Sequence, residues 1–197
     1  FLGVAACPSS LRSIGVVLVA TSPHTGASRL QNLYRLELGI SPDQLVLMYS
    51  GSMNKKQGLE ILVDAIRLLS DCQELVWLFV GDGPTKADLK RATVGFSQVI
   101  YLPLQPRERL NDLLNAADIH LLPQKGCASD LVLPSKLMGI LASGRPVVAT
   151  SNPGSELAQL SVQAGSCTKP GNAVTFAKAL RQLIDDPQQR HLSGSRA

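Results

Sequence analysis

Short apolar runs alternate with amphipathic segments along most of the chain. The runs are continuous rather than alternating, as in strands buried on both faces of a parallel sheet. They lie at residues 45–49, 75–80, 99–102, 118–123 and 146–150. Several end in residues typical of turns, such as Ser50-Gly51-Ser52 and Gly81-Asp82-Gly83. We expect each run to be a strand.

The segments between these runs have helical periodicity. Leu59, Leu62, Val63, Ile66 and Leu69 recur at helical spacing with charged residues between them. Further helices are expected after Pro84 and Pro106, over 135–143, and after an Asn172 cap. Strands alternating with helices predict an α/β fold: a doubly wound, mostly parallel, Rossmann-like sheet with helices on both faces, from about residue 45 to 186.

The beginning of the chain does not follow this pattern. Residues 14–19 are a candidate further strand, and residues 21–29 resemble a loop. We therefore expect two parts: an irregular segment over 1–33, left from an inter-domain region, and a folded domain over 34–197.

Composition removes several classes of protein. With 45% hydrophobic and 17% charged residues, the 197-residue chain is not disordered. The aromatic content of 4% leaves few platforms for base stacking, so no nucleic-acid partner is expected. The net charge of +4 is compatible with an anionic small ligand or a membrane surface and demands neither.

The four cysteines are scattered and form no C-x-x-C pair. This predicts no metal site and favours a reducing, cytoplasmic compartment. No apolar run is long enough to span a bilayer.

Ligands of doubly wound sheets bind beyond the carboxyl ends of the strands. There, Gly51, Ser52, Gly81, Asp82 and Gly83 form candidate anion loops, because glycine lets backbone N–H groups approach an oxyanion. The alternative is that these glycines simply end strands.

Gly81-x-Gly83 lacks the third glycine of a dinucleotide fingerprint, and the chain has no phosphate loop or nucleophile elbow.

The strongest group of candidate residues lies in the stretch 131–151. Leu133, Pro134, Ser135 and Lys136 open a helix, so backbone donors and an ammonium group gather at a helix N-terminus. This favours a diphosphate, although an ordinary capped helix with a solvated lysine remains the alternative.

Taken together, this stretch and residues 49–60, 80–84 and 116–123 resemble the carboxy-terminal domain of the family 4 (group 1) glycosyltransferases of GT-B architecture. The ordered series covers about residues 34–186. Within that family the likeness extends to the colanic-acid biosynthesis enzymes of the WcaI type.

The resemblance implies a domain that binds a nucleotide diphosphate sugar, in an enzyme that transfers the sugar with retention and needs no cofactor or essential metal. Gly51 and Lys56 would meet the diphosphate, and Leu104 lies in the loop that would flank the nucleobase. Ser52 stands where the family often has a basic residue.

The family also carries two glutamates that contact the donor sugar and ribose. By position they fall near Leu131 and on Gly139, neither of them acidic. Asp130, in the polar loop 124–130, is therefore the candidate catalytic residue, and the helix start at Pro134-Ser135-Lys136 the candidate substitute for the missing contacts. His120 lies within an apolar strand and is expected to belong to the core.

The chain has room for one of the two domains of such an enzyme. The implied partners are the nucleotide-sugar donor, an amino-terminal acceptor domain and a lipid-linked acceptor at the inner membrane face, where the enzyme would be peripheral. A nucleotide-sugar epimerase of the same architecture and a non-catalytic nucleotide-binding or assembly module remain alternatives.

Overall fold

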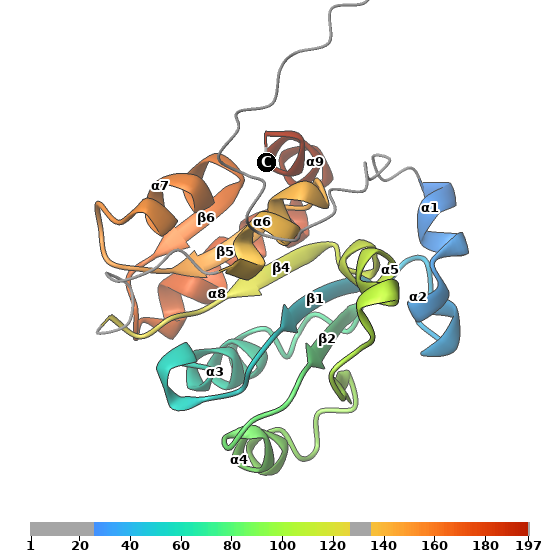
Figure 1. The fold of residues 1–197 in the computed structure, drawn as a ribbon, viewed down its shortest axis with the longest axis horizontal. Helices are drawn as coiled ribbons and strands as arrows, with labels where there is room; N and C mark the ends of the chain where they lie inside the picture. The colour runs from blue at the N-terminus through green and yellow to red at the C-terminus, as the bar shows by residue number, and fades with distance from the viewer. Residues whose placement is uncertain (1–25, 127–134, 197) are drawn as a thin grey trace, which may run out of the picture.

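The computed structural model describes residues 26–126 and 135–196. Its centre is a six-stranded parallel sheet in the order β3-β2-β1-β4-β5-β6. The doubly wound α/β fold expected from the sequence is therefore confirmed (Figure 1). The strands are β1 (Leu45–Ser50), β2 (Leu75–Val80), β3 (Val99–Leu102), β4 (Ile119–Leu122), β5 (Val147–Thr150) and β6 (Gly165–Thr168).

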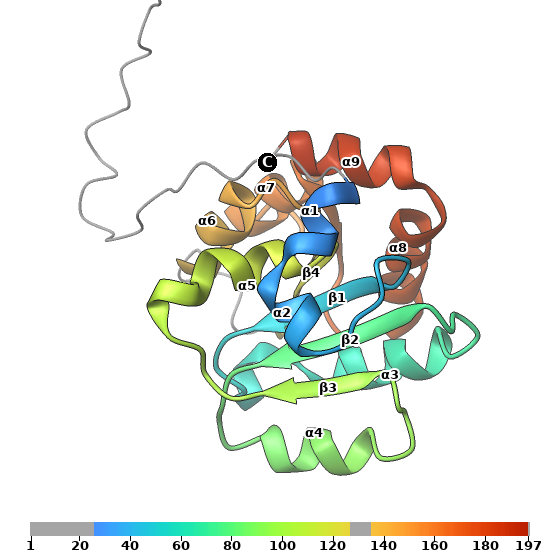
Figure 2. The same ribbon diagram turned by 90° about the vertical axis from the view of Figure 1, so that its right-hand side faces the viewer.

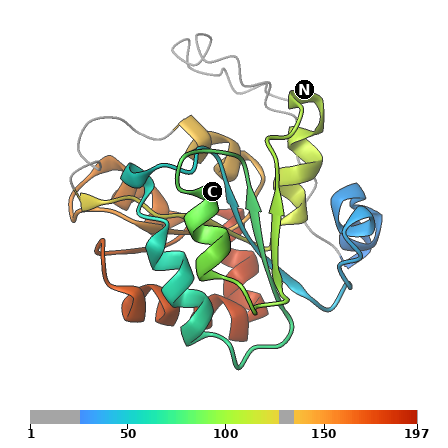
Figure 3. The ribbon, with the colours of Figure 1, turned by 90° about the horizontal axis from the view of Figure 1, so that it is seen from below.

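Helices cover both faces of the sheet. One face packs against α3 (Glu60–Leu68), α4 (Lys86–Ala92) and α8 (Ala173–Asp185). The other face packs against α2 (Leu33–Glu37), α5 (Leu110–Ala116), α6 (Ser135–Ala142) and α7 (Glu156–Gln163). The remaining described helices are α1 (Gly26–Gln31), α9 (Pro187–Ser195) and the short 3-10 turns Lys55–Gln57 and Arg107–Arg109. Figure 2 shows α1, α2 and α5 in front of the strands, and Figure 3 shows α3 and α4 on one side of them with α5 on the other.

The continuous apolar runs fill both layers of the core. Along β1, Leu47 and Tyr49 face the α3 and α8 layer, whereas Val46 and Met48 face α2 and α5. All four side chains are fully buried. A strand buried on both faces has no polar face to offer, which is why the run shows no period of two.

The folded part begins earlier than the sequence predicts. Residues 26–31 form α1, where a loop was expected, and Arg29 donates to the buried Asp118 carboxylate at 2.5 Å. Asn32 donates to the Asp112 carbonyl at 2.8 Å. These contacts tie residues 26–33 to the domain that we expected to start at residue 34. The candidate strand at 14–19 lies outside the described residues.

No helix in the described part of the chain is long and apolar enough to cross a membrane.

Candidate functional site

The sheet reverses its strand order between β1 and β4. From β1 the chain winds outward through β2 and β3, then returns to the other side of β1 for β4, β5 and β6. Such a switch point leaves a crevice beyond the carboxyl ends of the two central strands, where doubly wound proteins bind their ligands. The loop after β1 and the start of α6 both lie at this end of the central strands.

Lys136 connects these two segments. Its ammonium Nζ donates to the Tyr49 hydroxyl at 3.2 Å and to Gln57 Oε1 at 3.1 Å, and it lies 4.4 Å from the centroid of the Tyr49 ring. The Tyr49 hydroxyl in turn donates to the Ser52 carbonyl at 2.6 Å. Two segments that are far apart in the sequence thus meet at one ammonium group.

The charge of Lys136 has no partner of opposite sign in the described part of the chain. Its hydrogen-bond acceptors are a phenol and an amide, and it takes part in none of the ion pairs there. Burial lowers the pKa of Lys136 from its ordinary 10.5 to about 8. A half-buried cation with neutral partners costs free energy, and an anionic ligand would offset that cost.

The glycines of the two loops allow close packing. A Cβ on Gly51 would lie 3.2 Å from Lys136 Nζ, so this glycine leaves room for the ammonium group. A Cβ on Gly81 would lie 2.1 Å from the Gly51 carbonyl oxygen, and one on Gly83 would lie 2.3 Å from that of Met53. The loop after β2 can approach the loop after β1 only because these positions lack side chains.

Most backbone donors that we expected to face a phosphate are engaged elsewhere. The Gly51 N–H donates to the Val80 carbonyl at 2.9 Å, and the Gly81 N–H to that of Leu102 at 3.1 Å. The Gly83 N–H donates to Asp82 Oδ1 at 2.8 Å. These bonds extend the sheet and close the loop, so the charge of Lys136 is the main attraction for an anion here.

Replacing Gly81 with alanine is expected to destabilise the domain by about 2–4 kcal/mol. The new methyl group would overlap the Gly51 carbonyl, and the φ of +133° is strained for a residue with a Cβ. Gly95→Ala is the matched control, because Gly95 also has positive φ but nothing within 4 Å of its Cβ position. Urea denaturation measures both, and equal losses would contradict the packing role.

The other predicted residues are placed as follows. Ser52 and Lys56 are exposed, and Lys56 belongs to the 3-10 turn that also contributes Gln57. Asp82 is exposed, with its carboxylate 3.8 Å from Lys86. Leu104 follows β3 with 76% of its surface exposed. Ser135 is the first residue of α6 and is exposed.

The structure thus brings Gly51, Ser52 and Lys136 together around Tyr49, whereas it shows no contact of the Lys56 side chain with this group.

Asp130, Leu133 and Pro134 lie outside the described residues, as does Leu131. Gly139, the other position of the family's glutamate pair, lies in α6, and a Cβ there would be 3.4 Å from Leu114 of α5. A side chain at 139 would therefore press against α5.

Sequence reasoning missed three residues around the site. Tyr49 and Gln57 hold the Lys136 ammonium, and Lys86 donates to the Gly81 carbonyl at 2.8 Å. Tyr49 could have been predicted to lie at the site from the sequence, because a tyrosine near the end of a buried strand needs a hydrogen-bond partner for its hydroxyl.

His120 is fully buried in β4, as the apolar strand pattern predicts. Burial lowers the pKa of its imidazole to about 3, and its Nε2 lies 3.4 Å from the Ser143 hydroxyl. It is a neutral core residue. Within ranges 26–126 and 135–196, no three His, Cys, Asp or Glu side chains gather as a metal site.

Comparison with solved structures defines the class of fold. HepE of Anabaena, solved in complex with UDP and glucose, superposes with a TM-score of 0.72 at 19% identity, over 88% of this chain and 47% of that one. The C-terminal domain of LpcC, a group 1 family glycosyl transferase of Francisella tularensis, gives a TM-score of 0.69 at 17% identity, over 92% and 95% of the two chains. The fold is that of one half of a GT-B glycosyltransferase.

The sequence comparisons identify the family. Residues 44–186 match the family model for glycosyl transferases group 1, so this chain belongs to that family. A colanic acid biosynthesis glycosyl transferase, WcaI of Escherichia coli K12, is 35% identical over 155 residues. The alignment covers 76% of this chain and 38% of WcaI. TuaC of Bacillus subtilis, a teichuronic acid biosynthesis glycosyltransferase, is 32% identical, over 72% of this chain and 33% of its own length. The chain thus spans about a third of the length of TuaC and somewhat more of the length of WcaI.

Proposed function

We propose that this chain is the nucleotide-sugar-binding domain of a retaining glycosyltransferase that acts in polysaccharide biosynthesis. The observation that carries the proposal is the half-buried Lys136 ammonium at the switch point, whose partners among the described residues are all neutral. Family membership and the UDP named for HepE support the same ligand class. A nucleoside diphosphate supplies the missing negative charge.

In the proposed reaction, the bond between the anomeric carbon and the diphosphate oxygen breaks. The acceptor's hydroxyl oxygen bonds to that carbon, and the diphosphate leaves with the bonding electrons and takes up the hydroxyl proton. Lys136 would stabilise the charge that develops on the departing oxygen, as preorganised cations do at other oxyanion sites. The proposal invokes no metal or other cofactor, because the ammonium group supplies the positive charge.

The remaining parts of the proposal concern the whole enzyme. An amino-terminal domain would bind the acceptor, which we propose to be a saccharide or a lipid-linked intermediate at the cytoplasmic face of the inner membrane. Asp130, Leu133 and Pro134 are proposed to contact the donor beside Ser135, and Leu104 to contact the nucleobase. The exposure of Leu104 suits contact with a flat ring.

Calorimetric titration of this chain with UDP and GDP tests the proposal. We expect saturable binding of at least one of them, and no sugar transfer by the chain alone. A chain that binds neither nucleotide would instead be a non-catalytic module of the same fold. Robust transferase activity of the isolated chain would contradict the assignment to half an enzyme.

The pH dependence of UDP binding is expected to follow the ionisation of Lys136. The protonated ammonium binds the diphosphate, and its pKa in the free chain is about 8. Affinity should therefore stay constant from about pH 7, where the diphosphate is fully ionised, to about pH 8. Above that, it should fall by up to about tenfold per pH unit as the free chain loses the proton. Calorimetry at constant ionic strength measures this, and the same dissociation constant at pH 7 and 9.5 would contradict it.

A further inference from the structure

A cavity lies at the opposite edge of the sheet, at the amino ends of the two central strands. Its volume is about 540 Å³. Pro42 and Asp43 line it ahead of β1, Asp118 ahead of β4, and Arg145 and Pro146 ahead of β5. Residues of α1 and α9 complete the wall. It is separate from the crevice that contains Lys136, because the two sites lie at opposite ends of the same strands.

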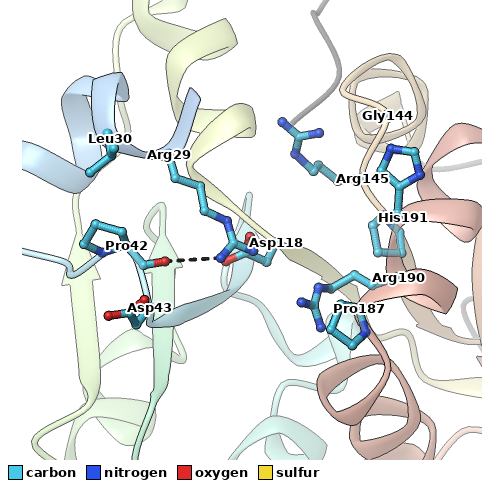
Figure 4. Close-up of a pocket in the computed structure, with 11 residues that line it drawn as sticks. Arg29, Leu30, Pro42, Asp43, Asp118, Gly144, Arg145, Pro187, Arg190 and His191 are labelled. Carbon is cyan, nitrogen blue, oxygen red and sulfur yellow. Dashed lines mark hydrogen bonds and ion pairs between the residues drawn. The ribbon is translucent and has the colours of Figure 1, made fainter. Parts of the chain in front are cut away.

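The lining of this cavity carries an excess of positive charge. Figure 4 shows three arginines around Asp118: Arg29 of α1, Arg145 ahead of β5, and Arg190 of α9. His191 lies beside Arg145. The Asp118 carboxylate already has two partners, since it forms ion pairs with Arg29 and with the buried Arg35. Asp43, the other acid in the wall, is exposed to water.

Arg145 and Arg190 have hydrogen-bonding capacity to spare. Arg145 has only 4% of its surface exposed, yet its Nε has no hydrogen-bond partner among the described residues. Its Nη2 donates to Asn115 Oδ1 at 3.1 Å. Arg190 uses Nη1 for the Leu183 and Ile184 carbonyls, at 2.6 and 3.1 Å. Both residues line the cavity, and neither forms an ion pair with an acidic side chain of the described residues.

The charge of Arg29 opposes the charges of both Arg145 and Arg190. The pKa of Arg145 falls to about 10, chiefly through burial. The Asp118 carboxylate opposes this fall, and the charges of Arg29 and Arg35 add to it. Burial likewise lowers the pKa of Arg190, Asp118 opposes that fall, and the charge of Arg29 adds to it. A cavity in which cations repel one another gains free energy when a multivalent anion enters.

We propose that this cavity binds a phosphate group, held by the Arg145 and Arg190 guanidinium groups with Arg29 and His191 at its rim. The planar guanidinium group can donate two parallel hydrogen bonds to two oxygens of one phosphate. A chloride ion has no such pair of oxygens. The phosphate could belong to a soluble phosphate ester or to a lipid headgroup, and both present the same oxygens. This second site does not depend on the proposed function of the Lys136 crevice.

NMR spectroscopy of the arginine Nε–H groups tests the proposal directly. The chain is titrated with inorganic phosphate at constant ionic strength, against chloride. We expect saturable shifts of the Arg145 and Arg190 signals. Arg190→Gln should weaken phosphate binding by about tenfold or more, corresponding to the loss of one charge-assisted hydrogen bond. Arg29→Gln is a second variant for the same measurement. It leaves the ion pair between Asp118 and Arg35 in place.

Matched controls separate this site from the nucleotide site. Arg91→Gln removes an exposed arginine of α4 and should leave phosphate binding unchanged. Lys136→Met should also leave it unchanged. No saturable shift, equal affinity in Arg190→Gln and Arg91→Gln, or loss of the shift in Lys136→Met would each overturn the proposal.

Sedimentation with vesicles identifies the source of the phosphate. Vesicles of phosphatidylcholine and phosphatidylglycerol in a four-to-one ratio are compared with phosphatidylcholine alone. Retention that requires Arg190 indicates a lipid headgroup, whereas phosphate binding without retention indicates a soluble ester. Either result supports the site, and absence of both phosphate binding and retention overturns it.

Discussion

Replacing Lys136 with methionine is expected to weaken UDP binding by about tenfold to a hundredfold. The ammonium would form charge-assisted hydrogen bonds to the diphosphate, worth about 1.5–3 kcal/mol, and each 1.4 kcal/mol corresponds to tenfold in affinity. Methionine keeps the apolar stem and removes the charge. Because this ammonium is half-buried with neutral partners among the described residues, the free energy of unfolding should stay the same or rise.

Two control variants show whether the effect belongs to this position. Lys178→Met removes an exposed lysine of α8 and should leave UDP binding unchanged. Lys56→Met should have a smaller effect than Lys136→Met, because Lys56 is exposed to water. Calorimetry measures all three variants. Native affinity in a folded Lys136→Met variant would remove the diphosphate assignment.

Replacing Asp118 with alanine is expected to destabilise the domain by about 3–5 kcal/mol. Its carboxylate accepts from Arg29, from Arg35 and from the Val46 N–H, and its side chain is 1% exposed. Removal would leave the buried Arg35 guanidinium without its counter-charge, which is the costly way to break a buried ion pair.

The comparison for Asp118 is an exposed ion pair of similar geometry. Asp64 pairs with Arg67 on α3, and both side chains are more than half exposed. Asp64→Ala should cost less than about 1 kcal/mol, since water screens such pairs. Chemical denaturation measures both variants. A loss below about 1 kcal/mol for Asp118→Ala would contradict the structural role of this carboxylate.

The central part of the fold was predictable because its strands are continuous apolar runs. The strands at 45–49, 75–80 and 99–102 were found by sequence within one residue of their observed ends. Burial on both faces requires such runs, and the helices between them must be amphipathic to cover the sheet. That pattern also predicts which loops lie at the carboxyl ends of the strands, where a ligand site is expected.

The outer elements were missed because they bury little apolar surface. The strand β6 reads Gly-Ser-Cys-Thr and is only partly buried at the edge of the sheet. The helix α9 is polar around most of its surface and has Gly194 as its one buried residue. The helix α1 is held by the Arg29 ion pair rather than by an apolar stripe. Local patterns give little signal when tertiary contacts hold an element in place.

The place of the candidate site in the fold follows from the sequence pattern, whereas the contacts within it do not. Lys136 was a candidate because it follows Pro-Ser at a helix start, and the structure places it beside Gly51. The prediction that Gly51 and Gly81 donate their amides to a ligand did not take account of the hydrogen bonds to neighbouring strands in which these amides are engaged. Such bonds depend on the register between β1, β2 and β3, which a single sequence does not reveal.

A crystal structure of this chain grown with UDP tests the central claim most directly. The account predicts diphosphate density beyond the carboxyl ends of β1 and β4, with oxygens within hydrogen-bonding distance of Lys136 Nζ. Well-defined UDP elsewhere on the molecule, with the Lys136 ammonium still bound only to Tyr49 and Gln57, would contradict it.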